Sequence, residues 1–218
     1  ELCLTMAYDA KVNYMDVLGS VKYWDILIYN ELRKKNIVIP QKIIRQKNEK
    51  FEGAYVKDPQ VGLHKWVMSF DLNSLYPHLI MQYNISPETL VANEKVKNMS
   101  VEKLLNREVD TSVLKDATMT PNGALFKTTQ KGFLPELMQK MYDDRVKFKQ
   151  LMLEAQKDYE KTKDPKLLRD ISKFNNIQMA KKISLNSAYG AIGNVWFRYY
   201  NILVAEAITT SGQLAIRH

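Results

Sequence analysis

The amino-acid sequence predicts a mixed α/β (α+β) fold, in which strand-forming segments and short helices are combined with a long antiparallel helical hairpin. Two observations support this prediction. A short aromatic run over residues 66–70 is compatible with a buried strand and leads directly into an aspartate and a turn. From Gly132 onward, apolar residues recur at three- and four-residue spacing along two long stretches. With 218 residues the chain can bury roughly 70% of its extended surface, so we expect one sizeable domain or two small ones.

The first part of the chain combines two helical segments with two strand-like runs. Residues 22–35 have a helical pattern, and the β-branched run 37–40 ends at a proline. Asp-Pro and Gly residues mark a loop over residues 57–66, which precedes the predicted buried strand 66–70. A helix is expected to start near Ser74, because a proline follows three residues later, and to continue to about residue 83.

The middle of the chain, residues 92–131, is polar and predicted to be irregular, with a strong turn signal at residues 121–123. A helix of about seven turns is expected to start at Gly132, with Pro135 in its first turn. Its apolar stripe consists of Leu134, Leu137, Met138, Met141, Phe148, Leu151, Met152 and Ala155.

A charged break at residues 161–165 separates this helix from a second one. Asp164 is a suitable N-cap and Pro165 a suitable first helical residue, and the second helix is expected to reach about Tyr189. Two long helices joined by so short a break predict an antiparallel hairpin. Periodicity alone is equally compatible with a plain packing element or a coiled-coil arm.

Asp71 is the first candidate for chemistry, because it is expected at a strand end beside a helix N-terminus. A helix N-terminus has unsatisfied backbone N–H groups and the positive end of a dipole. A phosphate can therefore dock where a Mg²⁺ ion held by the carboxylate also reaches it. The alternative is that Asp71 only caps a turn.

The predicted hairpin carries a second group of candidates. Arg145 falls in the middle of the apolar stripe, where a cation needs an anion, and Lys149 follows one turn later. On the second helix, the spacing of four and three residues places Lys182, Asn186 and Tyr189 on one face. The alternative interpretation is an ordinary solvated helix face.

Composition favours a polyanionic partner without selecting one. The 32 Lys and Arg residues exceed the 24 Asp and Glu residues, giving a net charge of +8 and a pI near 9.3. A single cysteine, Cys3, excludes a disulfide within the chain, and three scattered histidines form no zinc pattern, so a reducing cytoplasm is expected. We expect no membrane partner, because no apolar run approaches a membrane span and no signal peptide is visible.

Several motifs, in order along the chain, resemble those of one family. Residues 71–77, Asp-Leu-Asn-Ser-Leu-Tyr-Pro, resemble the first palm motif of the family B DNA polymerases. Residues 182–190 resemble the fingers motif of that family, and residues 51–55 resemble its template-strand loop. The stretches 22–25 and 193–200 are similar to segments of the replicative polymerases of large tailed bacteriophages. If the resemblance holds, the protein works in the cytoplasm of an infected bacterial host.

The resemblance implies a partial polymerase palm, with an antiparallel sheet, into which the fingers are inserted as the helical hairpin. The implied division is a connection from an exonuclease region over 1–50, a first part of the palm over 51–131, the fingers hairpin over 132–186 and a second part of the palm over 187–218.

The resemblance also implies an activity, which is template-directed DNA synthesis. A primer 3′-hydroxyl attacks the α-phosphorus of a dNTP and pyrophosphate leaves, assisted by two Mg²⁺ ions. The implied catalytic residues are Asp71 and Lys182, and the metal ligands are Asp71 and the carbonyl of Leu72. Implied nucleotide contacts are Leu72, Ser74, Leu75, Tyr76 under the sugar, Arg145, Lys149, Lys182 and Asn186. Implied DNA contacts are Gly53, Ala54 and Tyr55 on the template, with Tyr189 and Gly190 at the new base pair.

The aspartate pair that supplies the second palm carboxylate in this family is not found in the sequence. Glu206 and the pair Asp143–Asp144 are the tempting substitutes, and we interpret both as solvated helix-surface residues. Exonuclease motifs are also not found, so the sequence assigns no proofreading. Because the sequence starts at Glu1 and stops within a helical pattern at His218, we expect a fragment. Its expected partners are a primer–template, a dNTP, the C-terminal portion of the polymerase and, through other regions, a sliding clamp.

Two other classes of protein remain as alternatives. A non-catalytic nucleic-acid-binding module explains the net charge and the aromatic residues, but it does not need an acid beside a helix N-terminus. A different nucleotidyl transferase with a palm, such as an RNA-synthesising enzyme, would share Asp71. The chain is also compatible with a subunit of a split polymerase. An RNA-synthesising enzyme would not need Tyr76. Binding of dNTP that depends on Mg²⁺ separates the enzyme classes from the binding module.

Overall fold

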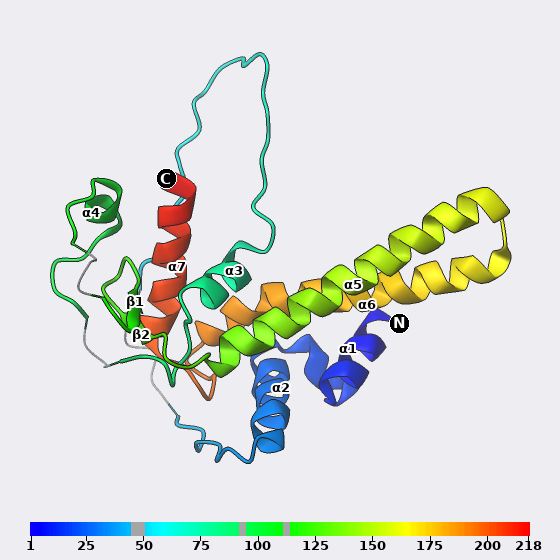
Figure 1. Cartoon of the computed structure of the whole chain (residues 1–218), viewed down its shortest axis with the longest axis horizontal. Coiled ribbons are helices and arrows are strands. Elements are labelled where there is room, and N and C mark those ends of the chain that lie inside the picture. The colour runs from blue at the N-terminus through cyan, green and yellow to red at the C-terminus, as the bar shows by residue number, and fades with distance from the viewer. Residues whose placement is uncertain (45–50, 92–94, 111–113) are drawn as a thin grey trace.

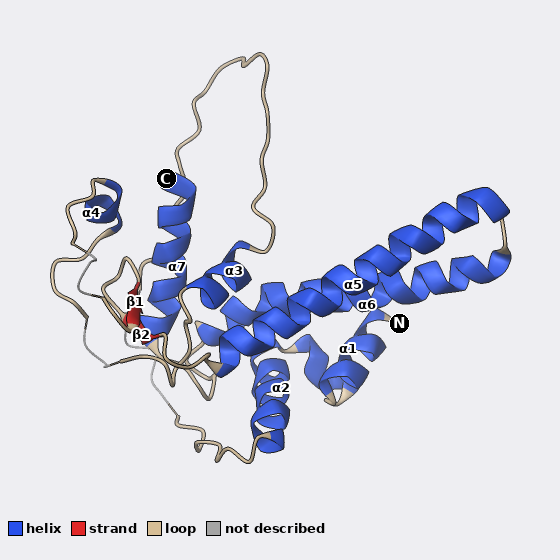
Figure 2. Cartoon of the chain, viewed as in Figure 1, coloured by secondary structure: helices blue, strands red, loops and turns tan. Residues whose placement is uncertain are grey.

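The computed structural model describes residues 1–44, 51–91, 95–110 and 114–218, and most of its regular structure is helical (Figure 2). A small two-stranded antiparallel sheet completes it, so the mixed class is confirmed with more helix and less sheet than predicted. The α-helices are α1 (Leu2–Ala10), α2 (Ser20–Lys34), α3 (Leu75–Gln82), α4 (Val101–Leu105), α5 (Phe133–Thr162), α6 (Pro165–Ile192) and α7 (Ile202–Arg217), with a 3-10 helix at Tyr14–Leu18 and strands β1 (Ala117–Met119) and β2 (Leu125–Lys127).

The predicted helical hairpin is confirmed and dominates the shape of the molecule (Figure 1). Helix α5 has 30 residues, about eight turns, and α6 runs back along it. The connection follows the expected chemistry, because the Asp164 side chain accepts a hydrogen bond of 2.9 Å from the backbone N–H of Lys166. Pro165 is the first residue of α6, and Lys163, which ends α5, has the left-handed φ of 55°. Local sequence signals therefore determine this element.

Helix α2 anchors the part of α6 that is nearest to the body of the molecule. The side chains of Tyr23 and Trp24 are both 1% exposed. The Tyr23 hydroxyl shares a hydrogen bond of 2.7 Å with the Ser184 hydroxyl, and Trp24 Nε1 donates one of 3.0 Å to Ser187 Oγ. Because buried polar groups are costly without partners, these two bonds fix the rotation of α6 about its axis.

A buried lysine ties three helices together. Lys181 of α6 is 7% exposed, and its Nζ lies 2.6 Å from Asp9 Oδ2 of α1 and 3.2 Å from Asp144 Oδ2 of α5. Two carboxylates compensate the charge of this desolvated cation. The ion pairs therefore fix α6 relative to α1 and α5.

Replacing Lys181 by Met should lower the free energy of unfolding by about 2 kcal/mol. The loss is smaller than for a fully buried pair, because both carboxylates are more than a third exposed and stay partly solvated. Urea unfolding measures it, with Lys147→Met on the exposed side of α5 as the matched control, expected within about 0.5 kcal/mol of the unaltered chain. Equal midpoints for the two variants would show that the ion triad does not stabilise the fold.

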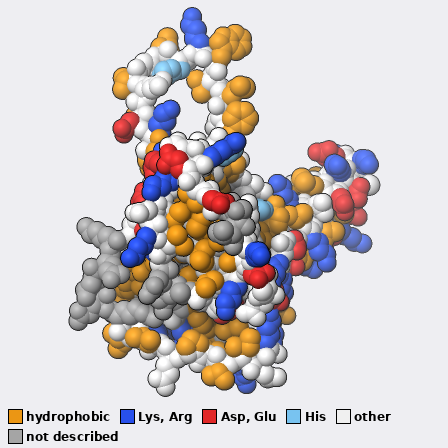
Figure 3. All heavy atoms as spheres, turned by 60° about the vertical axis from the view of Figure 1, so that its left-hand side comes forward, with side chains coloured by type: hydrophobic (Ala, Val, Ile, Leu, Met, Phe, Trp, Pro, Cys, Tyr) orange, Lys and Arg blue, Asp and Glu red, His pale blue; other side chains and the backbone are white. Residues whose placement is uncertain are grey.

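Both predicted strands in the first part of the chain are wrong. Residues 37–40 and 66–70 have no regular structure, and Trp66 and Phe70 are 98% and 88% exposed. Figures 1 and 3 show that the segment before α3 leaves the body as an open loop with apolar side chains on its surface. A strand needs a neighbouring strand for its backbone hydrogen bonds, and none of the described residues provides one for either run.

The middle of the chain is less irregular than predicted, because it contains α4, β1 and β2. Thr118 pairs with Phe126 in the two-stranded sheet, and the predicted turn at residues 121–123 connects the strands. In this turn Gly123 donates its N–H to the Thr120 carbonyl at 2.8 Å and has a φ of 85°, which glycine adopts without strain. Residues 92–94 and 111–113, and the end of the predicted connection at 45–50, lie outside the described residues.

None of the helices in the described ranges combines the length and the apolar character that crossing a lipid bilayer requires.

Candidate active site

An open pocket of about 380 Å³ lies where the start of α3 meets the facing sides of α5 and α6. This volume is within the range of small-molecule sites. The lining comes from three separate parts of the sequence and includes every predicted nucleotide-binding residue except Lys149. The lining residues are Asp71, Leu72, Asn73, Ser74, Leu75, Tyr76, Pro77, Arg145, Lys182 and Asn186.

The start of α3 supplies backbone N–H groups to this pocket. Helix α3 begins at Leu75, as predicted, after Ser74, whose φ of 54° is left-handed and reverses the chain. The Ser74 carbonyl accepts hydrogen bonds of 3.1 Å from the His78 N–H and of 2.9 Å from His78 Nδ1. The first N–H groups of a helix have no partner one turn earlier, so the positive end of the α3 dipole lies at the pocket. This arrangement suits an anion.

Arg145 connects α5 to the start of α3. Its Nη1 donates a hydrogen bond of 2.9 Å to Ser74 Oγ and a longer one of 3.4 Å to Asn73 Oδ1. Both acceptors are neutral. Among the residues that the structure describes, no carboxylate forms an ion pair with Arg145.

Helix α6 adds a second cation on the opposite side. Lys182 and Asn186 are exposed, lie one turn apart and line the pocket, as their spacing predicted. In the described part of the chain Lys182 also lacks a carboxylate partner. Lys149, one turn beyond Arg145, is exposed but does not line the pocket, so its nucleotide contact stays a prediction.

Tyr76 and Tyr189 form an aromatic pair at one side of the pocket. Their ring centroids are 4.9 Å apart with an angle of 54° between the planes. Burial raises the pKa of both hydroxyl groups, and the pKa of Tyr189 is raised further by Tyr76. A Cβ at Gly190 would meet no atom within 4 Å, so packing within the chain does not require glycine there and its predicted DNA contact stays a prediction.

Asp71 lies at the edge of the pocket and is exposed. Its carboxylate, the Leu72 carbonyl and the Asn73 amide oxygen are hard oxygen ligands of the kind that Mg²⁺ prefers. They include one carboxylate, and the described ranges contain no group of three or more His, Cys, Asp or Glu residues placed to hold a metal. The local donors therefore fit one part of a magnesium site.

Comparison with known proteins identifies the family. The family model described as DNA polymerase family B matches residues 20–218, which include the pocket and the whole hairpin. The chain belongs to DNA polymerase family B. The family B chain is 34% identical over 260 aligned residues to the DNA-directed DNA polymerase of Escherichia phage RB69 and 31% identical over 258 to that of Enterobacteria phage T4.

These two alignments cover all of the family B chain but 28% of each phage polymerase, so the chain spans just over a quarter of their length. The fold also resembles the solved structure of the family B DNA polymerase from Pyrobaculum calidifontis, with a TM-score of 0.71 and 21% identity. That alignment covers 99% of this chain and 26% of the archaeal one.

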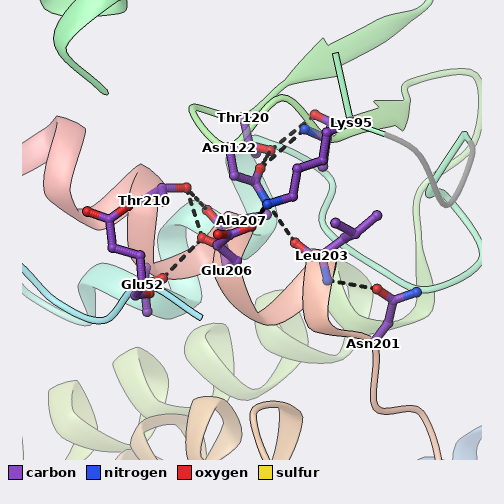
Figure 4. A network of polar contacts seen from close by, with 11 residues as sticks. Glu52, Lys95, Thr120, Asn122, Asn201, Leu203, Glu206, Ala207 and Thr210 are labelled. Atoms are coloured by element: carbon purple, nitrogen blue, oxygen red, sulfur yellow. Dashed lines mark hydrogen bonds and ion pairs between the residues drawn. The ribbon is translucent and has the colours of Figure 1, made fainter. Parts of the chain in front are cut away.

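The substitute carboxylates considered from the sequence do not join Asp71 at the pocket of the family B chain. Glu206 was interpreted as a solvated residue, which is wrong, because its side chain is 15% exposed and pairs with Lys95. Asn122 Nδ2 also donates to Glu206 Oε2 at 3.2 Å, and Figure 4 shows both partners pointing toward this carboxylate. Asp144 pairs with Lys181. Glu206 thus connects α7 to the segments that contain Lys95 and Asn122, and Asp144 connects α5 to α6. Neither these carboxylates nor Asp143 line the pocket.

Three residues of α7 that the sequence analysis did not single out contact segments of the family B chain with predicted roles. Thr209 Oγ1 donates a hydrogen bond of 2.7 Å to the Glu52 carbonyl, and Gln213 Nε2 donates one of 2.7 Å to the Gly53 carbonyl. The third, Gly212, packs against Tyr76. The available signal was the run of polar residues 209–213 inside an otherwise apolar helix, a pattern that indicates a buried polar contact.

Proposed function

We propose that this chain forms the nucleotide-binding part of a DNA polymerase active site and takes part in template-directed DNA synthesis within a larger enzyme. The observation that carries the proposal is the convergence of Arg145, Lys182 and the N-terminus of α3 on one pocket with Asp71 at its edge. Two cations without carboxylate partners and a helix N-terminus are complementary to a polyphosphate.

In this proposal the triphosphate lies between α3 and the hairpin. The backbone N–H groups of Ser74, Leu75 and Tyr76 bind phosphate oxygens, and Arg145 and Lys182 bind the β- and γ-phosphates, with Lys149 at the rim. Asn186 contacts the nucleotide, and the sugar rests on the Tyr76 ring. As the primer 3′-hydroxyl attacks the α-phosphorus, negative charge grows on the departing pyrophosphate, and fixed cations stabilise that charge without reorganising.

Asp71 and the Leu72 carbonyl would hold Mg²⁺. When bound, two such ions lower the pKa of the attacking hydroxyl and neutralise charge on the leaving oxygens. A single carboxylate is too few to hold both ions. The other carboxylate, and the neighbouring strands that residues 66–70 need, would come from a part of the polymerase outside this chain.

The proposed DNA contacts involve two segments. The template strand is proposed to contact Gly53, Ala54 and Tyr55, which α7 holds through Gln213 and through Arg217, whose guanidinium lies 5.2 Å from the Tyr55 ring centroid. Tyr189 and Gly190 are proposed to contact the new base pair from its minor-groove side. The division into connection 1–50, palm 51–131 and 187–218, and fingers 132–186 is part of the same proposal.

The test uses the 218-residue chain as it is. It should bind a dNTP in the presence of Mg²⁺ and should bind it much more weakly with EDTA, because metal and cations share the triphosphate. The unphosphorylated deoxynucleoside is the control and should not bind measurably. A chain that binds single-stranded DNA but shows no binding of dNTP with Mg²⁺ is the non-catalytic module, and the proposal is then wrong.

In the same preparation, the chain should not extend a primer. Two-ion catalysis holds ions roughly 3.5–4 Å apart and needs more than one palm carboxylate, whereas the pocket contains Asp71 alone. A radiolabelled primer–template with all four dNTPs gives the measurement. Templated synthesis by the isolated chain would mean that a second catalytic acid lies within it.

A further inference from the structure

Gly212 lies in α7 directly against the ring of Tyr76. A Cβ placed on Gly212 would lie 2.9 Å from Tyr76 Cε1, closer than carbon atoms pack, and 3.6 Å from Tyr76 Cδ1. Its third neighbour would be Leu79 Cδ1 at 3.8 Å. Glycine inside a helix is less stable than alanine by roughly 0.5–1 kcal/mol. The backbone at Gly212 is helical, a conformation that any residue adopts. Glycine is therefore required because the Tyr76 ring leaves no room for a side chain, and not because of its backbone angles.

A Tyr76 ring displaced by a side chain at position 212 has to move away from α7. Helix α3 lies between α7 and the hairpin (Figure 1), so a methyl group on α7 pushes the ring toward α6. On that side stands Tyr189, with its ring centroid 4.9 Å away, and the pocket that Tyr76 itself lines. The distance between the α7 backbone and the ring therefore determines how far the ring projects into the pocket.

We propose that Gly212 is a specificity-determining residue, which positions Tyr76 and thereby determines how strictly the pocket distinguishes deoxyribose from ribose. It acts through the Tyr76 ring and does not touch the nucleotide. This inference rests on the proposed function, because it assumes that the pocket holds a nucleoside triphosphate with its sugar on Tyr76.

The test is single-nucleotide incorporation by the complete polymerase that contains this chain. Gly212→Ala should raise the ratio of kcat/KM for dNTP to kcat/KM for rNTP by about tenfold, because the displaced ring leaves still less room at the 2′ position. In a Tyr76→Val background, which lacks the ring, Gly212→Ala should leave the ratio unchanged. Ser211→Ala, a buried neighbour that points about 100° away around the helix, is the matched control and should not change the ratio.

Four outcomes would overturn the inference. An unchanged ratio in a folded Gly212→Ala enzyme would do so, as would an equal change with and without the Tyr76 ring. If the unaltered enzyme incorporates no nucleotide, the proposed function fails and the inference fails with it, so the two failures are distinguishable. If Gly212→Ala does not fold, Leu79→Ala tests the inference in the opposite direction, by letting the ring move away from the pocket. It empties space on the α7 side of the ring, and the ratio should fall, whereas an unchanged ratio would again contradict the inference.

Discussion

In the complete polymerase, Lys182→Ala and Arg145→Ala each lower kcat/KM for dNTP by roughly 30- to 1,000-fold, a loss on the order of 2–4 kcal/mol. Both side chains point a charge without a carboxylate partner at the same pocket from opposite helices. The phosphates they are proposed to bind become more negative in the transition state than in the bound nucleotide. Part of the loss should therefore appear in kcat and part in KM.

Single-turnover incorporation at varied dNTP concentration measures both parts, and primer–template affinity is measured separately by titration. Affinity for DNA should stay nearly unchanged in both variants. Lys147→Ala removes an exposed lysine of α5 outside the pocket and serves as the matched control, with kinetics close to those of the unaltered enzyme. If DNA affinity collapsed while chemistry at saturating dNTP was unaltered, the two residues would be duplex-backbone contacts instead.

The second large effect is expected at Tyr76. Tyr76→Ala or Tyr76→Val in the complete enzyme should raise kcat/KM for rNTP relative to dNTP by about tenfold or more, because a packed ring leaves no room for a 2′-hydroxyl. Tyr189 and Gly212 support the ring from two sides, which makes this wall rigid. Rigid walls exclude larger ligands more strictly than mobile ones.

Two controls make the Tyr76 result interpretable. Tyr76→Phe keeps the ring and should discriminate almost as well as the unaltered enzyme, so the wall and the hydroxyl are tested separately. A thermal melt establishes that each variant is folded. An unchanged ratio of rNTP to dNTP in a folded Tyr76→Val enzyme would leave Tyr76 as a packing residue.

The sequence predicted those parts of the molecule that local signals determine. The hairpin follows from apolar periodicity, from the Asp164 cap and from Pro165, all within one helix or one turn. Arg145 and Lys182 occupy fixed positions on these helices. The helix faces on which they lie could therefore also be predicted from their spacing. The run at residues 66–70 was not, since a strand is stable only beside another strand and the described part of the chain supplies none.

Contacts between segments that are distant in the sequence could not be predicted either, because they also depend on how the elements are arranged in space. Glu206 carries the same charge whether it is solvated or paired, and only the fold brings Lys95 and Asn122 to it. Gly212 is 136 positions from Tyr76 in the sequence, yet the Tyr76 ring occupies the space where a side chain at position 212 would lie. The polar run 209–213 indicates buried partners but does not say which backbone carbonyls they are. Such partners become visible only when the helices are placed in space.

The length of the hairpin separates its tip from the pocket, which Arg145 lines from near the middle of α5. Arg145 lies 17 positions before Thr162, the last residue of α5, which corresponds to about 25 Å along the helix. This distance exceeds the Debye length of roughly 8–10 Å at physiological salt, so the lysines of the tip are electrically screened from the pocket. A fluorophore attached at Lys163 would thus report any swing of the hairpin at its greatest amplitude while leaving the binding site chemically unaltered. The tip of the hairpin is for the same reason a suitable attachment point for linking the protein to a surface or to a second protein.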